Sequence, residues 1–128
     1  MSAGDSGTPL IGKLGFHPGE FIYVEDTPDW YSKFTSEHSL DLTPGLPATH
    51  VHLFCDSQAS LQQFLEENQL EDIEKSLWVS WPKKASGVKT DLTEQSFRDA
   101  ILPLGWVDVK VAAIDDVWSG LKFVRRKS

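Results

Sequence analysis

Three clusters of polar residues each follow an apolar run that is typical of a β-strand. Glu25, Asp26 and Thr27 follow the first run, Asp56 and Ser57 follow the second, and Trp81, Lys83, Lys84, Ser86 and Gly87 follow the third. Ligands of parallel α/β sheets usually bind at the carboxyl ends of the strands, so these are candidate ligand-binding residues. The set combines carboxylates, hydroxyls and ammonium groups, which suits a small polar ligand.

The loop WPKKASGVKTD, which follows the third run, has the composition of an anion-binding loop. Lys83 and Lys84 supply positive point charges, and the backbone N–H groups near Ser86 and Gly87 are candidate donors to a phosphate or a carboxylate. The spacing is not that of a P-loop. The alternative is a solvent-exposed connection in which Gly87 serves a turn.

Two tryptophans and two aspartates flank the same end of the predicted sheet. Trp81 and Trp118 are candidates for an aromatic wall beside the loop, and the alternative is that they pack in the core or at its rim. Asp115 and Asp116 lie between the last two apolar runs, where carboxylates commonly shape a turn. We therefore add Trp118 to the candidate ligand-binding residues and assign the two aspartates to the turn.

Two histidines and one cysteine carry further chemistry. His50 and His52 lie two apart in a strand-like run and so point to the same face, a geometry that can serve a metal. No cysteine or third histidine stands at ligand spacing, so we favour a hydrogen-bonded or surface pair and assign no metal site. Cys55 is a nucleophile only if its pKa is lowered, and a buried, inert thiol is the preferred interpretation. With no Ser/His/Asp order, zinc signature or glycine-rich fingerprint, we assign no catalytic residue.

Alternating strand-like and helix-like segments must position these residues. We expect strands over residues 21–25, 50–56, 77–81, 106–114 and 119–127, and helices near 29–35, 57–70 and 93–104. Ser57 and Thr93 are predicted helix caps, and Pro103 is expected to distort the last turn of its helix. Parallel neighbours need crossover helices, whereas the last two strands are close enough to pair antiparallel. The order predicts a three-layer, Rossmann-like α/β fold, a mainly parallel sheet of about five strands that ends in an antiparallel hairpin.

The sequence carries two resemblances. From residue 50 onwards the element order resembles the end of a methyltransferase-type Rossmann domain, which finishes with a helix and two antiparallel-inserted strands, here WVDVKVAAI and SGLKFVRRK. The strings PLIGKLGFHPGE, LWVSWPKKASGVKTDLTE and GWVDVKVAAIDDVWSGLKFVRRK also look like a family of short bacterial proteins known only as a domain of unknown function. That likeness covers most of the chain and implies a fold and a bacterial origin, but no activity.

The cofactor half of a methyltransferase has no clear counterpart in this sequence. In those enzymes the first strand leads into a glycine-rich turn beside S-adenosylmethionine, and a later strand ends in an acid that holds the ribose. Here the first strand runs into Glu25, Asp26, Thr27 and Pro28 without a glycine. Too few residues separate the first helix from the second strand for two further strand and helix pairs. We therefore do not expect S-adenosylmethionine to bind, and the cofactor is unknown.

Length and composition place the chain among small globular proteins. With 128 residues, of which 40% are hydrophobic and 24% charged, it has the size and balance of one domain. We expect residues 1–8 to be disordered and residues 9–128 to form a single Rossmann-like domain. No window approaches the ~20 apolar residues of a membrane helix, and the N-terminus does not resemble a signal peptide, so we expect a cytoplasmic protein with no membrane partner. The lone Cys55 agrees with a reducing compartment.

Charge is unevenly distributed along the chain. Residues 1–74 hold 13 acidic and two basic side chains, whereas residues 75–128 hold six acidic and ten basic ones, for a net charge of −7. Because non-specific affinity for nucleic acid comes from neutralising phosphates, we expect no nucleic-acid partner. We interpret Arg125, Arg126 and Lys127 as a solvated tail that keeps a terminal strand soluble.

These observations favour a binding module over an enzyme. We expect a non-catalytic domain that binds a small anionic ligand or a protein partner through the strand-end residues. One alternative is a divergent, methyltransferase-like transferase in which Asp26, Asp56 or Cys55 handles a proton. The other is a homo-oligomer in which the terminal strand of each chain pairs with that of a second copy.

Overall fold

The computed structural model describes residues 9–127, so the expected disorder of residues 1–8 lies outside the described part of the chain. Four α-helices are present, α1 (Leu10–Leu14), α2 (Tyr31–Glu37), α3 (Gln58–Glu67) and α4 (Glu94–Ile101). The strands are β1 (Phe21–Glu25), β2 (Asp41–Leu42), β3 (Ala48–Phe54), β4 (Ile73–Pro82), β5 (Trp106–Ala113) and β6 (Trp118–Arg125). Three 3-10 turns complete the order, η1 (Leu70–Asp72), η2 (Lys84–Ser86) and η3 (Leu102–Leu104). None of the helices within residues 9–127 has the length and apolar character needed to cross a membrane.

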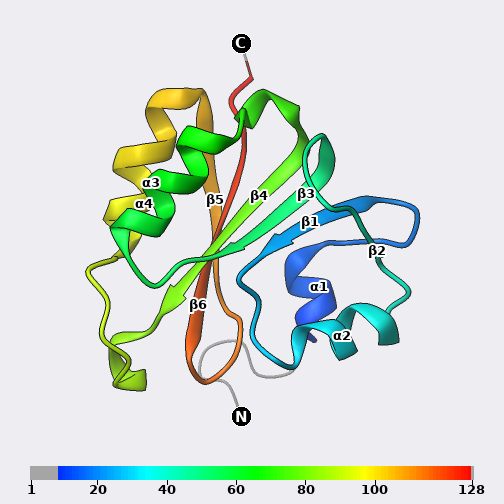
Figure 1. The fold of residues 1–128 in the computed structure, drawn as a ribbon, viewed down its shortest axis with the longest axis horizontal. Coiled ribbons are helices and arrows are strands. Elements are labelled where there is room, and N and C mark those ends of the chain that lie inside the picture. Colours follow the sequence, from blue (N-terminus) through cyan, green and yellow to red (C-terminus); the bar gives the residue numbers. More distant parts are fainter. Residues whose placement is uncertain (1–8, 128) are drawn as a thin grey trace.

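The six strands form one sheet in the order β2-β1-β3-β4-β6-β5 (Figure 1). Strands β1–β4 are parallel to one another, and β6 runs antiparallel to both β4 and β5. The predicted α/β class, with a mainly parallel sheet and an antiparallel hairpin, is confirmed. The sheet has one strand more than the five expected because two residues, Asp41 and Leu42, pair with β1.

The C-terminal strand lies inside the sheet and not at its edge. Strand β6 is hydrogen-bonded to β4 on one side and to β5 on the other, so the predicted pairing of this strand with a second copy is wrong. The edge strand next to β6 is β5, and its register with β6 is interrupted by a β-bulge between Asp108 and Lys110. Bulges of this kind are a common way to protect a sheet edge from pairing with another chain.

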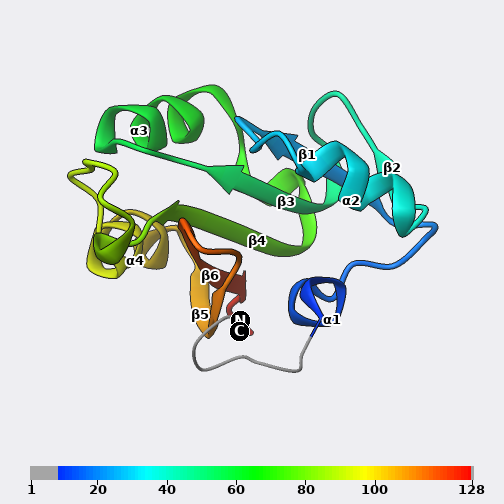
Figure 2. The same ribbon diagram turned by 90° about the horizontal axis from the view of Figure 1, so that it is seen from below.

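Side chains alternate between two cores on the two faces of the sheet. Val51 and Leu53 of β3 face α3 and α4, where they pack with Phe64 and Phe97. Phe54 of β3 belongs to the core on the other face, under α1 and α2. Figure 2 shows the two pairs of helices on opposite sides of the sheet. The sheet is therefore covered on both faces, as parallel sheets require.

Local sequence signals set the starts of the two helices nearest to the candidate site. Ser57 caps α3 by accepting a hydrogen bond from Ser60 N, and Thr93 and Ser96 form a capping box at the start of α4. Both predicted caps are confirmed. Pro103 lies in the 3-10 turn η3 that follows α4, as expected.

Strand β4 and the C-terminal arginines differ from the sequence predictions. Strand β4 begins at Ile73, four residues before the predicted start at residue 77, because parallel pairing with β3 extends across polar residues. Arg125 is not part of a solvated tail: its guanidinium donates to the backbone carbonyls of Leu70, Glu71 and Ile73 and lies 5.1 Å from the Trp106 ring centroid. Arg125 thus fixes the η1 turn against the hairpin.

Candidate functional site

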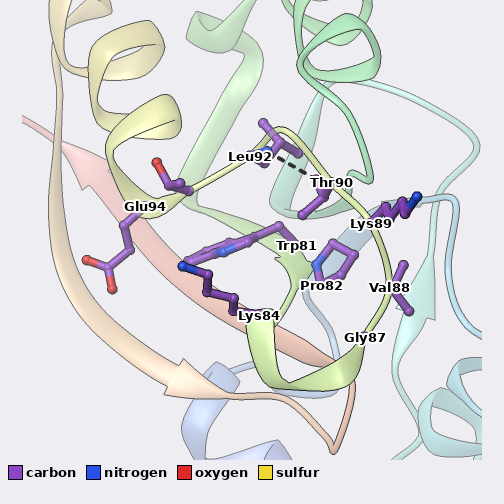
Figure 3. A pocket seen from close by; sticks show the side chains of 10 residues that line it. Trp81, Pro82, Lys84, Gly87, Val88, Lys89, Thr90, Leu92 and Glu94 are labelled. Carbon is purple, nitrogen blue, oxygen red and sulfur yellow. Dashed lines mark hydrogen bonds between the residues drawn. The ribbon is translucent and has the colours of Figure 1, made fainter.

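A pocket of about 630 Å³ opens at the carboxyl end of β4, between the loop of residues 83–93 and the start of α4 (Figure 3). Its lining residues are Trp81, Pro82, Lys84, Gly87, Val88, Lys89, Thr90, Leu92, Thr93 and Glu94. This volume lies within the range of about 300–1,000 Å³ that is usual for small-molecule sites. Three of the eleven residues predicted to bind ligand, Trp81, Lys84 and Gly87, line it.

Trp81 is the aromatic residue of the pocket lining. Its side chain is 8% exposed and packs against Phe97 of α4, with ring centroids 5.1 Å apart. Trp118 belongs to the opposite face of the sheet, where its ring contacts Phe54 at 5.0 Å. The predicted aromatic wall of Trp81 and Trp118 is therefore wrong, because consecutive strand positions alternate between the faces.

The donors that the sequence assigned to an anion are used within the loop. The N–H of Gly87 donates to Lys84 O at 3.4 Å, and the N–H of Val88 donates to the Ser86 hydroxyl at 3.2 Å. Ser86 donates to Lys83 O through both its N–H and its hydroxyl. The prediction that Ser86 and Gly87 offer backbone donors to a phosphate is wrong. Gly87, with φ at 80°, closes the η2 turn in a conformation that disfavours other residues.

Two ammonium groups of the pocket lining have no partner in the protein. Among residues 9–127, Lys84 and Lys89 make no hydrogen bond or ion pair through their side chains, and both are exposed. Figure 3 shows the Lys84 side chain extending in the same direction as that of Trp81, whereas that of Lys89 points the other way. Lys83 does not line the pocket, and its N–H donates to Val117 O at 2.7 Å. Lys84 and Lys89 are therefore the two cations of the lining.

The carboxylate in the pocket lining is neutralised within the protein. Glu94 accepts a hydrogen bond from the Arg98 guanidinium at 2.7 Å, one helical turn along α4. Arg98 also pairs with Asp108 of β5 at 3.0 Å, and both carboxylates raise the pKa of the Arg98 side chain. In Figure 3 the Glu94 carboxylate is directed away from Pro82 and Val88. The uncompensated charges of the lining are consequently those of Lys84 and Lys89.

A clasp of hydrogen bonds ties the pocket wall to the start of α3. Thr90 Oγ1 donates to Asp56 O at 2.7 Å, and the Gln58 N–H donates to Asp91 Oδ1 at 2.8 Å. The Gln58 side-chain amide donates in return to Asp91 O at 3.0 Å. Residues 90 and 91 thereby fix the wall that includes Leu92 and Thr93. Sequence reasoning missed this clasp because its partners are more than 30 positions apart and carry no local signal.

The remaining predicted site residues lie at the ends of β1 and β3 and do not line this pocket. Glu25 accepts a hydrogen bond from Tyr23 Oη at 2.5 Å, and burial together with this carboxylate raises the pKa of Tyr23 to about 12. Asp26 has a φ of 55°, and Thr27 is exposed. Asp56 contributes its backbone carbonyl to the clasp, while Ser57 caps α3. The structure thus gives Asp56 and Ser57 roles in positioning the chain.

His50 and His52 form buried hydrogen bonds on the face toward α1 and α2. His52 Nδ1 lies 2.7 Å from Tyr31 Oη, and its Nε2 lies 2.8 Å from Ser80 Oγ. His50 is bonded to Ser76 Oγ at 2.5 Å and to Glu20 Oε1 at 2.8 Å. These contacts match the hydrogen-bonded interpretation of the pair. Within residues 9–127 no group of three or more metal-ligating side chains is present.

Burial shifts the pKa values of these groups and of the cysteine. It lowers the pKa of His52 to about 3 and lowers that of His50 despite the Glu20 carboxylate. It also raises the pKa of the Cys55 thiol to about 12, with further contributions from the carboxylates of Glu25, Asp26 and Asp56. Cys55 is 1% exposed and protonated at neutral pH, so the structure agrees with a buried, inert thiol. Asp115 shapes the turn before β6, as predicted, by accepting the N–H groups of Val117 and Trp118.

A comparison with protein families shows the family to which the chain belongs. The family described as Domain of unknown function (DUF8412) matches residues 53–128, which is more than half of the sequence. The chain belongs to this family. The matched segment of the DUF8412 chain includes β4, the pocket loop, α4 and the β5–β6 hairpin. No curated protein matches the sequence.

Solved structures with a similar fold come from Rossmann-type proteins. A protein of Streptococcus agalactiae in the NADB-Rossmann superfamily is 10% identical, with a TM-score of 0.57 over 94% of this chain and 69% of that chain. Magnesium protoporphyrin IX methyltransferase of Synechocystis PCC 6803, solved with bound SAM, is 9% identical, with a TM-score of 0.58 over 91% of this chain and 74% of that chain. A proposed tRNA methyltransferase of Streptococcus pneumoniae is 12% identical, with a TM-score of 0.52 over 93% of this chain and 69% of that chain. At these identities the likeness shows the fold alone, which confirms the predicted Rossmann-like, methyltransferase-like architecture of the DUF8412 chain.

The residues of the DUF8412 chain do not fit S-adenosylmethionine in the manner that its fold implies. The turn after β1 has no glycine, and a side chain stands at Asp26, where φ is positive. The acid expected at the end of the next strand is also missing, since β2 ends at Leu42 and is followed by Thr43. Strand β2 reaches only Ile22 in its pairing with β1, three residues short of the end of that strand. We therefore assign this cofactor no role in the chain.

Proposed function

We propose that the DUF8412 chain is a non-catalytic module that binds a small organic anion in the pocket between the loop of residues 83–93 and α4. The observation that carries this proposal is that the partner-free ammonium of Lys84 and the indole of Trp81 line the same pocket. An ammonium group forms a charge-assisted hydrogen bond with an oxyanion, and an apolar part of the same ligand gains from burial against the lining. The ligand-binding site is thus the part of the predicted site that follows β4.

The titratable groups support a binding role over a catalytic one. A general base must lie within hydrogen-bonding distance of a substrate proton, and a nucleophile must be exposed in its reactive form. His52 is 0% exposed and bonded at both ring nitrogens, and Cys55 is buried and protonated. The Lys84 pocket contains neither a histidine nor a cysteine. Buried Cys55 also suits a protein that works in the reducing cytoplasm.

Thermal denaturation with candidate ligands tests the proposal. The purified chain is heated with S-adenosylmethionine, S-adenosylhomocysteine, common nucleotides, inorganic phosphate and small carboxylic acids, each at a series of concentrations. A ligand that binds only the folded state stabilises it by about 2.7 kcal/mol at a concentration one hundred times its Kd. We expect a saturable rise in Tm with at least one anion. The rise should be smaller in the variant Lys84→Ala and unchanged in Lys33→Ala, which removes an exposed lysine of α2.

Two results would overturn the proposal. No shift with any of these compounds would remove the small-ligand role and direct the search to protein partners. A shift with the adenosyl compounds that persists in Lys84→Ala would place the ligand elsewhere and favour a divergent transferase, the activity class of two of the solved structures of similar fold.

A further inference from the structure

The pocket offers an anion two ammonium groups that do not converge, and few other donors. Lys84 and Lys89 both line the pocket without a partner in the protein, and Figure 3 shows their side chains pointing in different directions. The N–H groups of residues 86–88 are bonded within the loop, and the Thr90 hydroxyl donates to Asp56 O. A dianionic phosphate group needs several convergent donors, as in a phosphate-binding loop. The pocket therefore suits a single monoanionic group.

The rest of the lining calls for an apolar, flat molecule. Trp81, Pro82, Val88 and Leu92 form the apolar part of the lining, and Val88 is 46% exposed. Burial of apolar area is the main favourable contribution available to a ligand here. Aromatic rings also gain from offset or edge-to-face contact with an indole ring. The space of about 630 Å³ accommodates a bicyclic ring system.

Charge in the lining excludes cationic ligands. Cations bind over tryptophan rings in many proteins, but here the ammonium groups of Lys84 and Lys89 line the same pocket as Trp81 and repel a further positive charge. Glu94 is engaged by Arg98, so it does not offset that repulsion. An acidic aromatic molecule is complementary to both features of the pocket.

We propose that the ligand class of this site is a planar aromatic carboxylic acid, with its rings against Trp81 and its carboxylate on Lys84. This inference rests on the proposed binding function and narrows it to one chemistry. Thr90 and Asp91 are positioning residues for this ligand, because their bonds to Asp56 and Gln58 hold the wall that carries Leu92.

The probe that tests the ligand class is 2-naphthoate. Its Kd is measured by titration of the ¹⁵N-labelled protein, with the Trp81 indole N–H signal assigned through the variant Trp81→Phe. Three further probes each remove one feature: cyclohexanecarboxylate lacks the aromatic ring, 2-naphthylmethylamine reverses the charge, and inorganic phosphate lacks the apolar part. We expect 2-naphthoate to bind at least about tenfold more tightly than any of the three, with a shift of the Trp81 signal.

Variants separate a specific carboxylate contact from general hydrophobic binding. In Lys84→Gln the Kd of 2-naphthoate should rise about tenfold, whereas the matched control Lys33→Gln should leave it unchanged. An equal Kd in Lys84→Gln and the parent protein would overturn the inference, as would binding that leaves the Trp81 signal unmoved. Asp91→Ala should also weaken the binding of 2-naphthoate, without altering the preference of the pocket for 2-naphthoate over cyclohexanecarboxylate.

The outcomes also distinguish this inference from the proposed function. If inorganic phosphate or a nucleotide moves the Trp81 signal and 2-naphthoate does not, the aromatic-acid class is wrong and the anion-binding function stands. If no anion of either kind moves that signal, both fail.

Discussion

The buried imidazole of His52 links three elements of the fold. It is 0% exposed and bridges Tyr31 of α2 to Ser80 of β4 from its place in β3. Burial keeps it neutral, with a pKa near 3 in place of 6.5. Sequence alone predicted that His50 and His52 share one face, because side chains alternate along a strand. It could not predict the partners, since Tyr31 and Ser80 are 21 and 28 positions from His52.

This histidine makes the stability of the protein depend on pH. The unfolded chain takes up a proton at His52 near pH 6.5, whereas the folded chain does so only near pH 3. The contribution of His52 to stability is therefore complete above pH 6.5 and is lost as the pH falls from 6.5 to 3. The slope is at most about 1.4 kcal/mol per pH unit. Below pH 4.5 Glu20 adds a slope of the same sign, because Lys75 and His50 outweigh the effect of burial and lower its pKa to about 2.

The variant His52→Leu tests this dependence. At pH 7.5 it should be less stable by about 1–3 kcal/mol, because Tyr31 and Ser80 lose a buried partner. Between pH 6.5 and 4.5 its free energy of unfolding in urea should fall less steeply than that of the parent protein. The control His17→Gln, at an exposed histidine, should keep the parent slope. Parallel pH profiles for His52→Leu and the parent would contradict the assignment.

At the scale of elements, the β6 strand depends on a close approach at Gly120. A Cβ atom placed there would lie 2.8 Å from Ile114 Cδ1 and 3.2 Å from Trp78 Cε3. Gly120→Ala should therefore lower the free energy of unfolding by about 1–3 kcal/mol through overpacking. Gly45→Ala is the matched control, because an added Cβ meets nothing within 4 Å and should change stability by less than about 0.5 kcal/mol. Equal stabilities of the two variants in urea unfolding would refute this account.

The clasp between α3 and the pocket loop gives a second prediction at this scale. Asp91→Ala removes the carboxylate that accepts the N–H of Gln58, the first residue of α3. This variant should lower the free energy of unfolding by about 1 kcal/mol. Amide hydrogen exchange should become faster at Gln58 and at the loop residues around Leu92. Asp116→Ala removes an exposed carboxylate of the β5–β6 turn and should change neither the free energy of unfolding nor these exchange rates. Unaltered exchange at Gln58 in Asp91→Ala would show that the clasp is absent in solution.

Elements with local signals were predictable from the sequence, and elements defined by distant pairing were not. Ser57 and Thr93 predict where α3 and α4 begin, because an N-cap depends only on residues within one helical turn. Strand β2 has two residues and exists only through its register with β1, so no periodicity could reveal it. The pocket itself combines one predictable part, the loop after β4, with a wall set by the long-range clasp.

At the scale of the whole molecule, the central strands join two cores into one structure. The family match begins at residue 53, inside β3, and so divides a strand that pairs with both β1 and β4. Strand β3 sends Val51 and Leu53 into one core and Phe54 into the other. Because a loss of packing on either face disturbs the same strands, the segments before and after residue 53 are predicted to unfold together.

A matched pair of conservative variants tests this cooperativity. Ile22 lies in the core under α1 and α2, Ile73 lies in the core under α3 and α4, and both are 0% exposed. Ile22→Val and Ile73→Val should each lower stability by about 0.5–1.5 kcal/mol. In both variants the urea transition followed by far-UV circular dichroism should coincide with that followed by tryptophan fluorescence, at an unchanged m-value. A transition that splits between the two probes in Ile22→Val alone would show that the segment before β3 is a separate unit, and that the matched region of 53–128 folds without it.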